Sequence, residues 1–176
     1  MGGVSPLLWR GRGEVVSCRR SMYLFVKFWV RTGLQFYCGK IDFDKTHMYN
    51  GDQPLILACS HPNSFFDALV MGAYHPRRLH FLARGDAFKN PRAAKALRML
   101  NMIPIYRLSE GKEHVENNRD TFDECNRVFK NKGTVLIFSE GVCVNEWKLR
   151  PLKKGTARLA YMCWEEHGDT ARRYQL

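Results

Sequence analysis

The stretch that decides the fold is PLILACSHPNSFFDALVMGAY, residues 54–74. It contains a run of apolar residues over 55–59, which predicts a buried strand. A Pro-Asn-Ser turn follows, and the apolar segment that continues from it predicts a helix over 64–74. His61 therefore stands where a buried strand ends, and Asp67 lies near the start of the following helix.

The same alternation of strands and helices continues along the chain. Further strands are predicted over 78–83, 102–107 and 133–139, and further helices over 90–100, 112–130 and 154–167. The first of these helices has Asn90 as its N-cap and Pro91 in its first turn. Because the strands are apolar on both faces, they predict a mostly parallel sheet covered by helices, which is an α/β fold.

The length and composition are those of one globular domain. The chain has 176 residues, of which 45% are hydrophobic and 26% charged, and this is enough for a single sizeable core. We divide it into a disordered lead-in (1–21), an amphipathic helical or interfacial segment with a linker (22–50), and the α/β domain (51–176). No run of about eighteen apolar residues occurs, so no segment is predicted to span a membrane.

Residues 22–38, MYLFVKFWVRTGLQFYC, predict an N-terminal amphipathic helix. Lys27 and Arg31 share one face of this helix, whereas the aromatic pair Phe28 and Trp29 lies elsewhere on the turn. Two interpretations fit the pattern. Either the helix lies on an anionic membrane surface with aromatic anchors and basic flanks, or it packs against the α/β domain.

The charge balance is strongly basic, with 28 Lys and Arg against 17 Asp and Glu and a formal net charge of +11. Such a surface favours anionic lipid, nucleic acid or a phosphorylated small molecule as a partner. No nucleic-acid-binding motif is present and no nucleic-acid partner is expected, but a basic module that binds anionic lipid or nucleic acid stays open as an alternative. The cysteines form no C-x-x-C pair, which argues against a zinc site and favours reduced thiols in a cytosolic setting.

Three polar residues stand at the carboxyl ends of predicted strands: His61, Arg107 and Glu140. These ends meet at one edge of a parallel sheet, where α/β proteins bind their ligands. A carboxylate at Asp67 can hold one nitrogen of the His61 ring and leave the other as a general base. A guanidinium such as that of Arg107 can bind a phosphate through two hydrogen bonds. Together, these residues indicate a functional site rather than packing alone.

The ordered set of this His–Asp pair, IPIYR (103–107), FSEG (138–141) and LKKGTARLA (152–160) resembles the glycerolipid acyltransferase family. That family includes glycerol-3-phosphate and lysophosphatidate acyltransferases. The resemblance covers roughly residues 22–167. It implies an O-acyltransferase of phospholipid biosynthesis that takes a fatty acyl group from acyl-CoA or acyl-carrier protein and needs no cofactor or metal.

The resemblance also implies roles for individual residues. His61 would be the general base that deprotonates the acceptor hydroxyl, and Asp67 would orient it. Arg107 would bind the acceptor phosphate, while Glu140 and Gly141 would shape the acceptor site. A thioester is already an activated donor, so no covalent acyl-enzyme is needed. The acceptor would be glycerol-3-phosphate or lysophosphatidate, and both the hydroxyl position (sn-1 or sn-2) and the donor (CoA or carrier protein) stay open.

The sequence departs from the family pattern near these residues. Five residues separate His61 from Asp67 where four are usual, a spacing that resembles one subgroup of fungal-type and bacterial members. Ser139 stands where the family usually has proline before Glu-Gly. Arg150 and Lys153 follow it in the sequence and are further candidates for contact with phosphate.

The resemblance implies a location and a boundary as well. The protein would be a peripheral membrane protein on the cytoplasmic face, with an acyl thioester donor, a phosphorylated glycerol or lysophospholipid acceptor and an anionic membrane surface as partners. The family continues with a further strand after the helix predicted over 154–167, and the polar residues that follow here do not match it. We therefore expect a C-terminally truncated member that lacks the last strand, with an inactive fragment of the family as the alternative.

Overall fold

The computed structural model describes most of the chain, namely residues 7–42, 53–63, 65–106, 118–144, 146 and 148–167. Side chains of the first helix are described from residue 20 onward. Most of the predicted linker, over 43–52, lies outside the described residues, and so do the first six residues of the helix predicted over 112–130.

The centre of the molecule is a sheet of four parallel strands in the order β1-β4-β2-β3. The strands are β1 (Leu55–Cys59), β2 (Leu79–Arg84), β3 (Met102–Ile105) and β4 (Thr134–Phe138). Each coincides with a strand predicted from an apolar run, and all described pairings are parallel. The predicted α/β fold is therefore confirmed.

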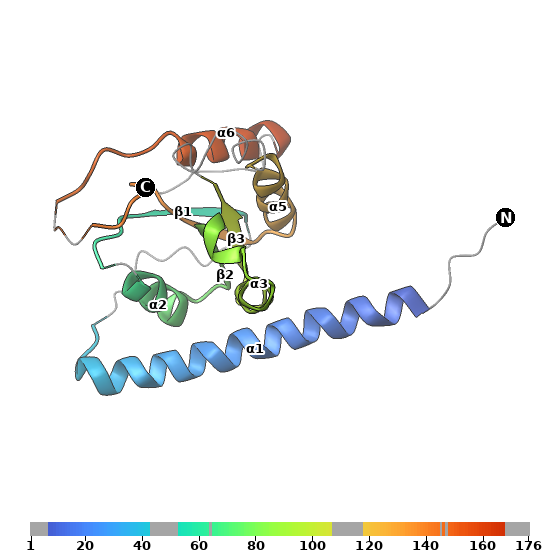
Figure 1. The fold of residues 1–176 in the computed structure, drawn as a ribbon, viewed down its shortest axis with the longest axis horizontal. Coiled ribbons are helices and arrows are strands. Elements are labelled where there is room, and N and C mark those ends of the chain that lie inside the picture. Colours follow the sequence, from blue (N-terminus) through green and yellow to red (C-terminus); the bar gives the residue numbers. More distant parts are fainter. Residues whose placement is uncertain are drawn as a thin grey trace.

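Helices cover both faces of this sheet. They are α1 (Leu7–Cys38), α2 (Phe65–Tyr74), α3 (Pro91–Met99), α5 (Asn118–Lys130) and α6 (Gly155–His167), with a short 3₁₀ helix η1 (Gly85–Phe88). Figure 1 shows α5 and α6 on one side of the strands and α2 and α3 on the other, with α1 running across the outer side of α2 and α3. The result is a helical layer on each face of the sheet, with a further helix outside one of them.

Alternation along β4 divides the apolar core into two parts. Val135 and Ile137 point to the α5 and α6 side, where they pack with Phe129. Leu136 points the other way and packs with Phe81 in the core beneath α2. Successive side chains of a strand point to opposite faces, so a strand that is apolar at every position is buried on both sides. This is the reason that the apolar runs identified the central strands.

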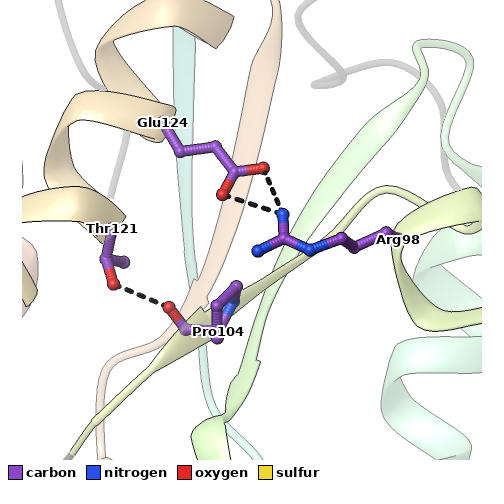
Figure 2. A network of polar contacts seen from close by, with 4 residues as sticks. All are labelled: Arg98, Pro104, Thr121 and Glu124. Carbon is purple, nitrogen blue, oxygen red and sulfur yellow. Dashed lines mark hydrogen bonds and ion pairs between the residues drawn. The ribbon is translucent and has the colours of Figure 1, made fainter. Parts of the chain in front are cut away.

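Side-chain hydrogen bonds fix α5 against β3 and α3. The Thr121 hydroxyl donates to the Pro104 carbonyl at 2.7 Å, which ties α5 to β3 (Figure 2). Arg98 at the end of α3 donates to both carboxylate oxygens of Glu124 on α5, at 3.0 and 3.2 Å (Figure 2). The predicted cap of α3 is also confirmed, because the Asn90 side chain accepts the Arg92 N–H at 2.9 Å.

α1 packs against the domain through the face that carries its cations. Tyr23 and Leu34 are buried, each with 6% of its surface exposed. Between them Lys27 donates to the His75 carbonyl, and the Arg31 guanidinium lies 5.2 Å from the centre of the Tyr74 ring. The packed interpretation of this helix is therefore confirmed, and these two cations face the protein.

The opposite face of α1 presents its large apolar side chains to solvent. Phe25, Phe28 and Trp29 have 63%, 64% and 58% of their surfaces exposed. The helix also begins earlier than the sequence suggested, since the proposed lead-in over 1–21 is helical from Leu7. Among the described helices, none is long and apolar enough to cross a bilayer.

Candidate active site

The predicted His–Asp pair is formed in the structure. His61 follows β1, Asp67 lies in the first turn of α2, and His61 Nδ1 is 3.1 Å from Asp67 Oδ2. Each side chain has 18% of its surface exposed. Because a carboxylate can only accept, Nδ1 is the donor in this contact, and Nε2 is the nitrogen that accepts a proton in the corresponding neutral tautomer. This is the arrangement of an oriented general base.

The turn between the two residues absorbs the additional residue in their spacing. The Asn63 carbonyl accepts the Phe66 N–H at 3.1 Å, and the Asn63 N–H donates to Asp67 Oδ2 at 2.8 Å. The same carboxylate oxygen therefore holds both the turn and the His61 ring. With five residues between them, the Asp67 carboxylate still reaches His61, because the backbone of Asn63 is hydrogen-bonded to the first turn of α2.

The sequence analysis missed an aromatic contact to His61. Phe138, the last residue of β4, stacks on the His61 ring with 3.7 Å between ring centres and 14° between ring planes. The register of the sheet explains this contact, and the sequence alone did not provide that register. Cys59 pairs with Phe138 across β1 and β4, and His61 lies two residues beyond Cys59, so the side chains at 59, 61 and 138 leave the same face of the sheet.

The segment after β4 carries the predicted Glu140 and Gly141. Glu140 is buried, with 5% of its surface exposed. Gly141 has a φ of +69°, a conformation that residues with a Cβ rarely adopt. A Cβ at Gly141 would also lie 3.1 Å from Lys153 Cγ, so the glycine is required both for the turn and for the close approach of the lysine.

Ser139 anchors this segment with two groups that proline lacks. Its N–H donates to the Cys59 carbonyl at 3.2 Å and continues the pairing of β1 with β4 for one residue. Its hydroxyl lies 2.9 Å from that of Thr156 on α6. The Lys153 N–H donates to the Ser139 carbonyl at 2.8 Å, so Lys153 is held beside the end of β4. The departure from the family's proline therefore has a structural role.

This geometry can be set beside known proteins. Residues 40–170 match the family model described as Acyltransferase. The match covers the His61–Asp67 pair, all four described strands and the whole of α6. The chain belongs to the acyltransferase family. No curated protein and no solved structure matches it significantly. The resemblance to glycerolipid acyltransferases is thus confirmed at the level of the family.

Two of the three predicted cationic phosphate ligands, Lys153 and Arg150, lie among the described residues. Lys153 lies beside Gly141 as described, whereas Arg150 pairs with Glu146, with 3.5 Å between Nη2 and Oε2. The interactions described for Arg150 do not join it to His61. Arg107 lies outside the described residues, and its role in phosphate binding stays a prediction.

A half-buried thiol of the acyltransferase, that of Cys59, lies two residues before His61 in the sequence. Burial, followed by the nearby Asp67 carboxylate, raises the pKa of Cys59 to about 11. The thiol is therefore protonated at neutral pH and is a poor nucleophile. Among the described residues, no three His, Cys, Asp or Glu side chains are grouped so that they could hold a metal ion, and metal-independent chemistry stays a prediction.

Proposed function

We propose that this acyltransferase moves a fatty acyl group from acyl-CoA or acyl-carrier protein to a hydroxyl of glycerol-3-phosphate or lysophosphatidate in phospholipid biosynthesis. The observation that carries the proposal is the His61–Asp67 contact of 3.1 Å at the carboxyl edge of the sheet. It gives one histidine a fixed tautomer and a free acceptor nitrogen at the place where α/β proteins bind substrates.

In the proposed reaction, His61 Nε2 takes the proton of the acceptor hydroxyl while the oxygen attacks the thioester carbonyl carbon. The Asp67 carboxylate stabilises the imidazolium that forms. Collapse of the tetrahedral intermediate breaks the carbon–sulfur bond, and the imidazolium returns its proton to the departing thiolate. The products are an ester and a free thiol, and His61 is again neutral. No acyl group is attached to the protein, consistent with the raised pKa of the Cys59 thiol.

The acceptor phosphate is proposed to bind near the end of β4. Lys153 supplies a cation there and is held by its own backbone bond to Ser139 and by its packing on Gly141. Arg107 and Arg150 remain candidates for the same phosphate, because Arg107 ends the IPIYR motif and Arg150 follows FSEG in the sequence. Glu140, buried at the end of β4, is proposed to shape the acceptor site.

We further propose that the enzyme works on a membrane surface, which suits a lipid acceptor. The outward face of α1 carries exposed Phe25, Phe28 and Trp29, and aromatic side chains are favoured at the interface between lipid and water. The formal charge of +11 favours anionic lipid. The cytoplasmic face stays an expectation from the cysteines. Co-sedimentation with anionic vesicles should fall for a Phe28→Ser, Trp29→Ser double variant, while Tyr161→Ser, Trp164→Ser, an exposed aromatic pair on α6, serves as its control.

The main test is release of free thiol from acyl-CoA or acyl-carrier protein in the presence of glycerol-3-phosphate or lysophosphatidate, with and without anionic vesicles. We expect thiol release that depends on the acceptor and is abolished by His61→Ala. Full activity of His61→Ala would refute the mechanism. Failure of the folded wild type with every donor and acceptor would favour the inactive-member alternative, and tight, strongly salt-dependent DNA binding without turnover would favour a basic binding module.

A further inference from the structure

One contact at the base is not used by the proposed mechanism, namely the stack of Phe138 on His61. The rings are nearly parallel, with 3.7 Å between centres and 14° between planes. The contact joins the end of β4 to the residue that follows β1, so the base is held from two strands and one helix.

The position of Phe138 follows from the register of the sheet. Cys59 is its partner across β1 and β4, and the Ser139 N–H extends that pairing to the Cys59 carbonyl. Phe138 itself packs at the edge of the apolar cluster that contains Phe81 and Leu136. The ring therefore extends from a paired position of β4, with apolar side chains beside it on the face where His61 lies.

A single hydrogen bond does not fix the orientation of an imidazole ring. The ring turns about two side-chain bonds, and Asp67 restrains the Nδ1 edge alone. A flat surface against one face of the ring restrains the remaining tilt. With both contacts, the direction in which Nε2 points is determined.

We infer that Phe138 is a positioning residue for acyl transfer, which fixes the plane of the His61 ring and so aims Nε2 at the acceptor hydroxyl. The inference rests on the proposed role of His61 as general base. The partly negative π face of the phenyl ring also favours the imidazolium that forms during the reaction. Both effects act on the chemical step more than on substrate binding, so loss of the ring lowers kcat and leaves KM little changed.

The experiment compares three variants in the whole chain. Phe138→Leu keeps an apolar side chain and removes the ring, and Phe138→Tyr keeps the ring. Phe81→Leu removes a ring from the same apolar cluster, where Phe81 is 8% exposed, and controls for general loss of packing. Steady-state kcat and KM are measured by thiol release. Proton NMR follows the His61 ring signals, assigned with His61→Gln, for the upfield shift caused by an aromatic ring on its face and for the bonded Nδ1 proton.

We expect Phe138→Leu to lose the upfield shift and the Nδ1 signal and to lower kcat by about tenfold or more, the order expected when a catalytic group is misplaced. Phe138→Tyr should restore both readouts, and Phe81→Leu should change neither. Wild-type kcat in Phe138→Leu, or an equal loss of kcat in Phe81→Leu, would overturn the inference. If the wild type turns over no substrate, the proposed function fails while NMR still decides this point, because a His61 ring that keeps its Nδ1 signal in Phe138→Leu is not positioned by Phe138.

Discussion

Replacement of Asp67 by asparagine removes one negative charge and keeps the shape of the side chain. Asp67 Oδ2 lies 3.1 Å from His61 Nδ1, and at an effective dielectric constant of about 20 two unit charges at that distance attract by about 5 kcal/mol. This attraction arises only when the ring becomes an imidazolium, so it stabilises the transition state and not the resting enzyme. An asparagine oxygen recovers part of it through its dipole. We therefore expect kcat to fall by about 10²–10³-fold, equivalent to about 3–4 kcal/mol.

The tautomer of the histidine adds to this loss. A carboxylate accepts only, whereas an amide can also turn its NH₂ group toward Nδ1. In that orientation the proton of the ring moves to Nε2, and the ring can no longer accept the proton of the hydroxyl. KM is expected to change little, because Asp67 is placed to act through His61 and not on the substrate.

The assay is steady-state release of thiol with a saturating acceptor, for Asp67→Asn beside Asp123→Asn. Asp123 is an exposed acid on α5, so its variant controls for the loss of one negative charge. Thermal unfolding of both variants shows whether the fold is retained. If folded Asp67→Asn keeps more than about a tenth of the wild-type kcat, Asp67 supplies less than about 1.4 kcal/mol, and the reasoning from charge and tautomer is refuted.

Three further predictions concern stability, each measured by urea unfolding. Gly141→Ala should cost about 1 kcal/mol more than Gly39→Ala, because both glycines have positive φ but only Gly141 has a side chain at 3.1 Å from the added Cβ; equal losses would contradict this. Thr134→Val should stabilise by about 1 kcal/mol, since the described structure gives this fully buried hydroxyl no partner. Thr121→Val should destabilise the protein by a similar amount, since it deletes the hydrogen bond of 2.7 Å from the Thr121 hydroxyl to the Pro104 carbonyl. If both threonine variants change stability in the same direction, hydrogen bonding of the hydroxyl does not decide their effects. Burial lowers the pKa of His75 below its usual 6.5, so near and below that pH the unfolded chain binds more protons than the folded one. The free energy of unfolding should therefore fall as the pH is lowered from about 7.5 to 5.5, and should fall less in His75→Gln. An equal fall in both proteins would contradict this.

Apolar patterning predicted the strands because each is buried against helices on at least one side. β4 is the clearest example, with Thr134, Val135, Leu136 and Ile137 all buried. The strand order was not accessible in the same way. β1 lies beside β4, the last of the described strands, and this arrangement depends on how the crossover helices pack and not on any local pattern.

The predicted faces of α1 were correct, but sequence could not decide which of them is turned inward. A lysine and an arginine usually indicate the solvent side of a helix. Here Lys27 donates to the backbone carbonyl of His75, just after α2, and the Arg31 guanidinium lies over the Tyr74 ring. These partners come from a segment more than forty residues away. Only the tertiary structure shows that these cations contact the α/β domain and that the aromatic side chains are exposed to solvent.

In the candidate site too, some features follow from neighbouring residues in the sequence, and others depend on contacts between distant parts of the chain. A His–Asp pair within seven residues is visible in any single sequence, yet whether the pair closes depends on how the turn folds. In this chain Asn63 closes the pair, because its carbonyl accepts the Phe66 N–H in the first turn of α2 and its own N–H donates to Asp67 Oδ2. The longer spacing is therefore no obstacle to a catalytic pair. The residue that completes the orientation of His61 is Phe138, seventy-seven positions away, and it becomes visible only once β1 and β4 are known to be neighbours in register. Motif spacing thus locates the proposed base, His61, and the pairing of β1 with β4 places the ring that would orient it.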